Sequence, residues 1–205
     1  MLLFSIAAHA EPIWYMKGKL GSTSADAEVG LDLFGRNYDI SDEDIVWGLT
    51  TGVKVTDYIA LELGYTDYNE FGGSYSSPET DPFTSNNYTV TGNANGELSA
   101  VAFSAVGILP VSDSFSLYGS LGLANWELNF RDDFISNNPA ALGFGSIRGS
   151  DRGTDLVMGL GAMVHLSDYV ALGIEYERFD VDSSMGFLDV DIGLNSVSAT
   201  VVLRL

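Results

Sequence analysis

The sequence of 205 residues contains no cysteine and only nine basic residues. Without cysteine the chain has no disulfide framework, no thiol nucleophile and no thiolate metal site. The nine basic residues stand against 28 acidic ones, a formal net charge of −19. Because such a chain repels phosphates at long range, nucleic acid is excluded as a partner, and so is polybasic attachment to anionic lipid.

Long apolar runs are also missing. The chain has no stretch of about 18 apolar residues, which a membrane-spanning helix requires. However, 46% of the residues are hydrophobic and 12% are aromatic, too many for a disordered acidic chain. A chain of this length can bury a sizeable core in a single domain. Any membrane-spanning form of it has to be a β-barrel.

The first residues are typical of an export signal. The apolar stretch from Met1 ends in Ala8-His9-Ala10, the small-x-small pattern of a signal peptidase site. We expect residues 1–10 to be a signal peptide, truncated because the usual positive start is missing, and residues 11–205 to be the barrel domain. His9 would be lost with the signal.

An internal repeat indicates β-hairpins. A Ser/Thr-Asp pair recurs at Asp57, Asp113 and Asp168, at intervals of about 55 residues, each time between strings of alternating apolar residues. Each pair predicts a tight turn and hence a hairpin. The three hairpins provide six strands. Two further alternating segments, at 14–20 and 197–205, bring the expected number to eight.

The lengths of the connections point to a membrane barrel. Long polar stretches, at roughly 22–44, 69–96, 130–153 and 180–191, alternate with the short turns. This distribution is typical of outer-membrane barrels. The predicted fold is all-β, an eight-stranded antiparallel up-and-down transmembrane β-barrel, present as a monomer. The segment 99–109 is apolar on both faces, so its inward face stays open.

The alternation of each strand separates an outward from an inward face. Outward, Trp47, Tyr65 and Tyr176 are predicted to form the upper aromatic girdle at the level of the lipid headgroups. Inward lie four of the nine basic residues and four carboxylates. These inward charges are Lys17, Lys19, Lys54, Glu62, Asp155, Glu175, Glu177 and Arg204.

The inward charges predict a salt-bridge network. An eight-stranded barrel is only wide enough for its own side chains, and an unpaired buried charge costs several kcal/mol, roughly the penalty of breaking a buried ion pair. We therefore expect a network that closes the lumen, with Lys19 level with Glu175. A narrow, gated water pathway is the alternative.

One candidate catalytic pattern is present. His165-Leu166-Ser167, followed by Glu175 or Glu177, is similar to the His-x-Ser pair of lipid A deacylases. However, Ser167 aligns with turn residues of the other two repeats, and its turn would face the periplasm. We therefore assign no catalytic residue and expect a protein that is not an enzyme.

No cofactor or metal site is expected either. The segment from Asp180 to Asp191 imitates a calcium loop, but Gly186 falls one place late and strands flank it. The acidic run 41–44 is typical of a hydrated surface.

Arg131, Arg148 and Arg152 are expected to form local pairs or to contact lipopolysaccharide phosphates.

Three features carry a resemblance to a known family: the opening W-Y-M-K-G-K-L-G-S (residues 14–22), the hairpin motifs and the closing alternating strand. Together they resemble the opacity-type porin family, and also the transmembrane domain of outer membrane protein A. The resemblance implies an integral protein of the Gram-negative outer membrane. Its expected partners are outer-membrane lipid, lipopolysaccharide and the outer-membrane assembly machinery.

The resemblance also implies a function class. It indicates a non-catalytic barrel with a structural or adhesive role through four external loops. A narrow channel for ions or small solutes is the alternative, and a lipid A-modifying enzyme is a remote one. A soluble lipocalin-like carrier is disfavoured because charged residues, among them Lys17 and Glu62, lie on the predicted inward face.

Overall fold

A computed structural model describes the backbone of residues 13–31, 36–81, 83–138, 143–185 and 188–205, and their side chains except those of 26–43 and 184–190. The predicted signal peptide lies outside the described residues. No helix in the described part of the chain is long and apolar enough to cross a membrane.

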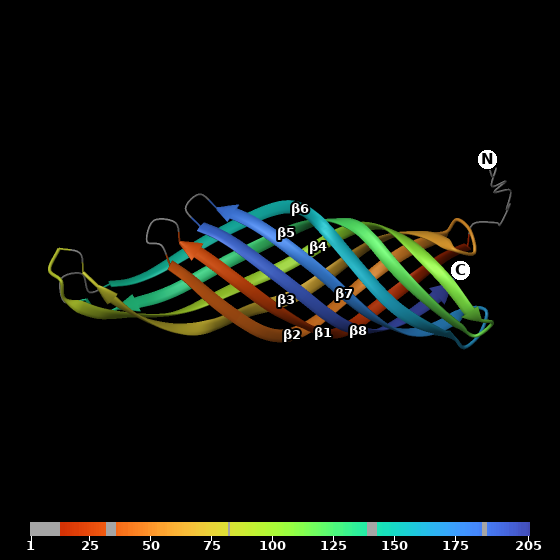
Figure 1. Cartoon of the computed structure of the whole chain (residues 1–205), viewed down its shortest axis with the longest axis horizontal. Helices are drawn as coiled ribbons and strands as arrows, with labels where there is room; N and C mark the ends of the chain where they lie inside the picture. The colour runs from red at the N-terminus through yellow and green to blue at the C-terminus, as the bar shows by residue number, and fades with distance from the viewer. Residues whose placement is uncertain (1–12, 32–35, 82, 139–142, 186–187) are drawn as a thin grey trace, which may run out of the picture.

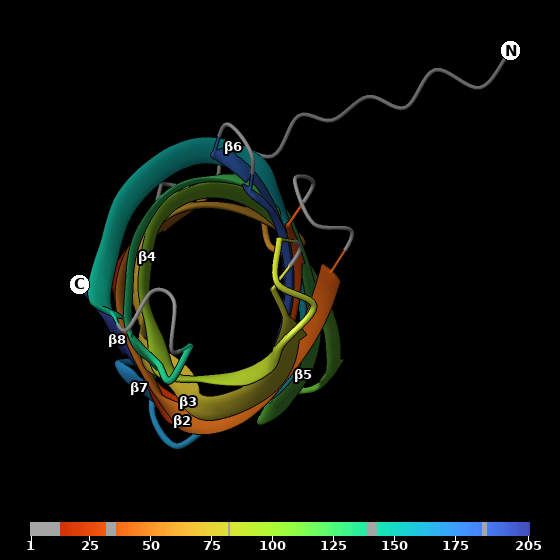
Figure 2. The ribbon, with the colours of Figure 1, turned by 90° about the vertical axis from the view of Figure 1, so that its left-hand side faces the viewer.

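Eight strands form a closed barrel in which each strand pairs antiparallel with its sequence neighbours and β1 closes on β8 (Figures 1 and 2). The strands are β1 (Ile13–Leu31), β2 (Arg36–Lys54), β3 (Ile59–Thr80), β4 (Asn87–Ser112), β5 (Phe115–Ser136), β6 (Gly143–His165), β7 (Val170–Met185) and β8 (Leu188–Arg204). The predicted fold class is confirmed, and tight turns occur at all three Ser/Thr-Asp repeats.

The outer surface carries a band of large apolar side chains. Leu20, Leu49, Phe103 and Leu160 are 62%, 57%, 58% and 66% exposed. A water-soluble fold would bury such residues, whereas a barrel in lipid presents them to the acyl chains. The face that the sequence left open is now decided, because Phe103 points outward with its alternate neighbours.

The strands continue well beyond the apolar band. They are 16 to 26 residues long, about twice the roughly 9–11 residues that cross a bilayer. The predicted long loops were wrong, because the ladders run on to pairs such as Thr80↔Asn87 and Ser136↔Gly143. Glycine, serine and asparagine suggested loops, but here they form paired hairpins, which project at the left of Figure 1.

The projecting part is divided into two sheets. β2 pairs with β3 only up to Trp47↔Asp67, and β6 pairs with β7 only up to Val157↔Phe179. Beyond these points β7, β8, β1 and β2 form one sheet, and β3 to β6 form the other. A β-bulge between Asp67 and Glu70 marks the place where β3 separates from β2.

An apolar core lies inside the barrel on the side of the projecting hairpins. Trp126 and Phe179 are its largest fully buried members, at 1% and 0% exposure. The described members of this apolar layer are Ala25, Val46, Tyr68, Leu98, Ala100, Ala124, Trp126, Leu128, Val157, Phe179, Val181, Ile192 and Leu194.

Candidate functional site

The centre of the lumen holds an ion cluster around Lys17. The Lys17 Nζ donates to Glu62 Oε2 at 2.9 Å and to Glu175 Oε2 at 3.0 Å. Tyr15 donates its hydroxyl to Glu62 at 2.7 Å, and Tyr118 donates to Glu175 at 2.9 Å. Each of the two carboxylates therefore accepts one hydrogen bond from the lysine and one from a tyrosine hydroxyl. Buried charges need such ion pairs and hydrogen bonds to offset the loss of hydration.

A second ion pair lies closer to the projecting hairpins. The Lys19 Nζ is 2.8 Å from both carboxylate oxygens of Glu177, and Tyr68 donates to Glu177 Oε1 at 2.8 Å. The Tyr68 ring stacks on Phe179, with centroids 5.7 Å apart. Tyr68 therefore joins this pair to the apolar layer.

The ion pairs and the apolar layer fill successive levels of the lumen. Lys17, Glu62 and Glu175 are less than 10% exposed. Above them the Trp126 indole N–H donates to Asp155 Oδ2 at 2.6 Å. Buried side chains therefore occupy the lumen at both levels, ion-paired at the first and mainly apolar at the second.

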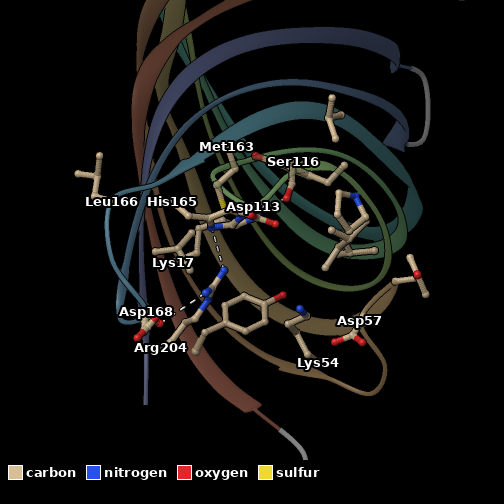
Figure 3. Close-up of a pocket in the computed structure, with 18 of the residues that line it drawn as sticks. Lys17, Lys54, Asp57, Asp113, Ser116, Met163, His165, Leu166, Asp168 and Arg204 are labelled. Atoms are coloured by element: carbon tan, nitrogen blue, oxygen red, sulfur yellow. Dashed lines mark hydrogen bonds between the residues drawn. The ribbon is translucent and has the colours of Figure 1, made fainter. Parts of the chain in front are cut away.

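A cavity of about 640 Å³ opens on the other side of the ion pairs, between the three tight turns (Figure 3). Tyr15, Lys17 and Glu62 line its inner end, and Asp57, Asp113 and Asp168 lie at its rim. We call it the turn-side cavity.

His165 is held from two strands inside the turn-side cavity. Arg204 of β8 donates from Nη2 to His165 Nδ1 at 2.9 Å, and Ser116 of β5 lies 2.9 Å from Nε2 (Figure 3). Since Arg204 can only donate, the neutral imidazole carries its proton on Nε2 and donates to Ser116.

The structure brings five of the eight predicted lumen charges together and leaves three apart. Lys17, Lys19, Glu62, Glu175 and Glu177 form the ion pairs. Lys54 and Arg204 line the turn-side cavity. Asp155 accepts from Trp126 and, across the gap between β6 and β7, from the Asp182 N–H at 3.4 Å.

One expected pairing differs from the structure. Lys19 was expected level with Glu175, but Lys19 contacts Glu177 while Lys17 contacts Glu175. Barrel strands tilt against the axis, so a count of residues from the turns misplaces partners on different strands. That these pairs stabilise the barrel stays a prediction.

The candidate catalytic pattern is not assembled. The Ser167 hydroxyl accepts from the backbone N–H groups of Tyr169 and Val170 at 3.3 and 3.1 Å, which is a turn contact. His165 contacts Ser116 and Arg204 instead. A neutral His165 that donates to Ser116 cannot take the serine proton, so this pair does not form an activated nucleophile.

The predicted calcium-like segment falls partly on residues 184–190, whose side chains lie outside the description. Among the described residues, no group of three or more His, Cys, Asp or Glu side chains is placed to hold a metal ion. Of the basic residues predicted near this end, Arg131 pairs with Asp133 at 2.7 Å, and Arg152 pairs with Glu127 at 2.8 Å.

The predicted girdle residues all face outward. Trp47, Tyr65 and Tyr176 are 42%, 38% and 43% exposed, and the first two rings lie 5.7 Å apart. They lie at the end of the apolar band nearest the projecting hairpins. Three further exposed aromatics, Trp14, Tyr58 and Tyr169, lie near the opposite end.

The family model described as "Outer membrane protein beta-barrel domain" matches residues 1–204. The chain belongs to this outer membrane β-barrel family. It is therefore an integral protein of the outer membrane, and the apolar band is its lipid-facing surface. In barrels of this kind the short turns face the periplasm and the longer connections face outward.

Solved structures share the fold at low sequence identity. The outer membrane protein OprG of Pseudomonas aeruginosa has 14% identity over 97% of this chain and 98% of its own, with a TM-score of 0.56. Neisserial surface protein A has 13% identity over 94% and 97%, with a TM-score of 0.50. AlkL, solved in lipid bilayers, has 13% identity over 97% and 93%, with a TM-score of 0.50. No curated protein is similar enough in sequence to match the chain.

Sequence reasoning missed two groups of residues in this outer membrane barrel. The apolar layer escaped because the hairpins were interpreted as loops, although alternate apolar residues such as Trp126 and Leu128 or Phe179 and Val181 continue the inward parity. The second group is the aromatic residues at the periplasmic end. Their place could have been predicted from the sequence, because Tyr58 and Tyr169 directly follow the repeated aspartates.

Proposed function

We propose that this outer membrane barrel is a non-catalytic, non-conducting protein with a structural or adhesive role. The observation that carries the proposal is that two successive layers of buried side chains occupy the lumen, the ion pairs of Lys17 and Lys19 and the apolar layer around Trp126. A barrel closed in this way anchors its projecting hairpins and offers no passage to solutes.

The projecting hairpins support the adhesive form of this role. They are paired strands, so their backbone groups are satisfied within each sheet, and they extend beyond the apolar band. Paired hairpins present a defined surface at a lower entropic cost on binding than flexible loops would.

Planar-bilayer conductance of the purified protein tests the closed lumen. The folded state is first verified by the gel shift between boiled and unboiled samples. We expect no stable current steps from the wild type. Reproducible steps whose size changes in Glu175→Gln, but not in the outward-facing Arg178→Met, would establish the channel alternative instead.

The absence of catalysis is tested separately. Mass spectrometry of lipid A from cells with and without the protein is expected to give the same profile. A change in acylation that disappears with Ser116→Ala or His165→Gln would overturn the proposal.

A further inference from the structure

The turn-side cavity contains two cations that have no anionic partner among the described residues. Every other described lysine of the lumen is ion-paired: Lys17 with Glu62 and Glu175, and Lys19 with Glu177. Lys54 has no carboxylate within 4 Å among the described residues, and Arg204 donates only to the neutral acceptors His165 Nδ1 and the Asp168 carbonyl. Both side chains are half-buried.

These two cations approach the cavity from the same side of the barrel. Lys54 lies on β2 and Arg204 on β8, with β1 between them, because Ile13 pairs with Lys54 and Tyr15 pairs with Arg204. Figure 3 shows both side chains extending into the cavity together with His165.

The opposite wall is partly apolar. Val106 and Ile108 of β4 and Met163 of β6 line the cavity there, with Ser116 and Tyr118 of β5 between them. The volume of about 640 Å³ is in the range of small-molecule sites, about 300–1,000 Å³, in which an apolar wall faces a few convergent polar groups. A matching ligand has a charged end and a compact apolar body.

The carboxylates at the rim limit the charge of that ligand. Asp57, Asp113 and Asp168 are exposed at the turn tips, where water screens them. Glu62, at the inner end, shares the Lys17 ammonium with Glu175 and accepts from Tyr15. A monocarboxylate places its one charge at Lys54 and Arg204, whereas a second charge elsewhere on the ligand would lie closer to these carboxylates.

We propose that the turn-side cavity binds a small organic monocarboxylate with an apolar body, its carboxylate held by Lys54 and Arg204 and its body against Val106, Ile108 and Met163. The site faces the periplasm and needs no passage through the lumen. It is independent of the structural or adhesive role.

The test uses benzoate as the probe, with the folded protein in lipid nanodiscs near pH 7. Benzyl alcohol and benzylamine serve as neutral and cationic comparisons, and inorganic phosphate serves as an anion without an apolar body. Binding is followed by NMR shifts of the cavity residues. Only benzoate is expected to saturate. Benzyl alcohol or phosphate binding as tightly as benzoate would overturn the proposal.

A substitution tests whether Lys54 binds the carboxylate of the ligand. Lys54→Met is expected to weaken benzoate binding roughly tenfold, which is the loss of one charge-assisted hydrogen bond. The matched control Arg178→Met removes a cation on the lipid-facing side and should leave binding unchanged. Equal affinity in wild type and Lys54→Met would contradict the proposal.

A second measurement on the wild type needs no variant. His165 contacts Ser116 and Arg204 directly. The other polar and titratable groups that line the same cavity are Lys54 on β2, Tyr58, Asp57, Asp113 and Asp168 at the turns, and Tyr15, Lys17, Glu62 and Tyr118 at the inner end. A bound carboxylate offsets the two cations, so the midpoint of the His165 NMR titration should rise in saturating benzoate. An unchanged midpoint would overturn the proposal.

Discussion

Lys17 places one ammonium group between two buried carboxylates, Glu62 and Glu175. Removing the cation in Lys17→Met leaves both carboxylates buried without a counter-ion. Because breaking a buried pair costs about 3–5 kcal/mol, we predict a loss of that size in the free energy of unfolding, measured by denaturant titration in lipid vesicles.

Two controls separate charge pairing from packing. Neutralising the partners as well, in Lys17→Met with Glu62→Gln and Glu175→Gln, should recover much of the lost stability. Arg178→Met breaks the exposed pair with Asp180 and should have little effect, because exposed pairs contribute little. A loss in Lys17→Met no larger than in Arg178→Met would show that the central pairs do not stabilise the barrel.

At the scale of the element, β3 changes its neighbours at a single bulge. Asn69 lies there with a positive φ of 65°, a conformation that costs β-branched residues roughly 1–2 kcal/mol. Its side-chain amide also donates to Asp44 Oδ1 at 3.2 Å, across the line where β2 and β3 separate. Residue type and backbone conformation therefore agree at this bulge.

Asn69→Val should lower the free energy of unfolding by about 1–2 kcal/mol. Asn69→Gly, which accepts the same φ, should be close to neutral. If both substitutions cost the same in a denaturant titration, the amide contact with Asp44 matters and the backbone conformation does not.

At the scale of the whole molecule, the membrane-spanning half and the ends of the hairpins are separable. Tyr75 pairs with Gly92 on β3 and β4, beyond the described apolar layer. We predict that replacing residues 76–91 by Asn-Gly, a favoured two-residue hairpin turn, leaves a folded barrel with an unchanged gel shift between boiled and unboiled samples.

The shortened barrel also separates the two forms of the proposed role. If the role is adhesive, cells carrying the shortened barrel should attach to surfaces no better than cells without the protein. If it is structural, they should resist detergent as well as cells carrying the full chain. Loss of the gel shift would show that the hairpin ends are needed for folding.

The strand number, the three tight turns and the lipid-facing side of most strands could all be predicted from the amino-acid sequence. These features depend on local patterns, namely Ser/Thr-Asp turns and a period of two, which neighbouring residues establish without the rest of the chain. Trp47, Tyr65 and the inward Lys17 and Lys19 were found in this way.

The closed barrel was needed to learn which inward charges meet and how far the strands extend. The pairing of Lys17 with Glu175 depends on strand tilt, which follows from closing eight strands into a ring. The division of the hairpins into two sheets over an apolar layer depends on contacts between strands far apart in the chain, such as Tyr68 with Phe179. The turn-side cavity, which is lined by the three turns and by seven of the eight strands, likewise exists only once the barrel has closed.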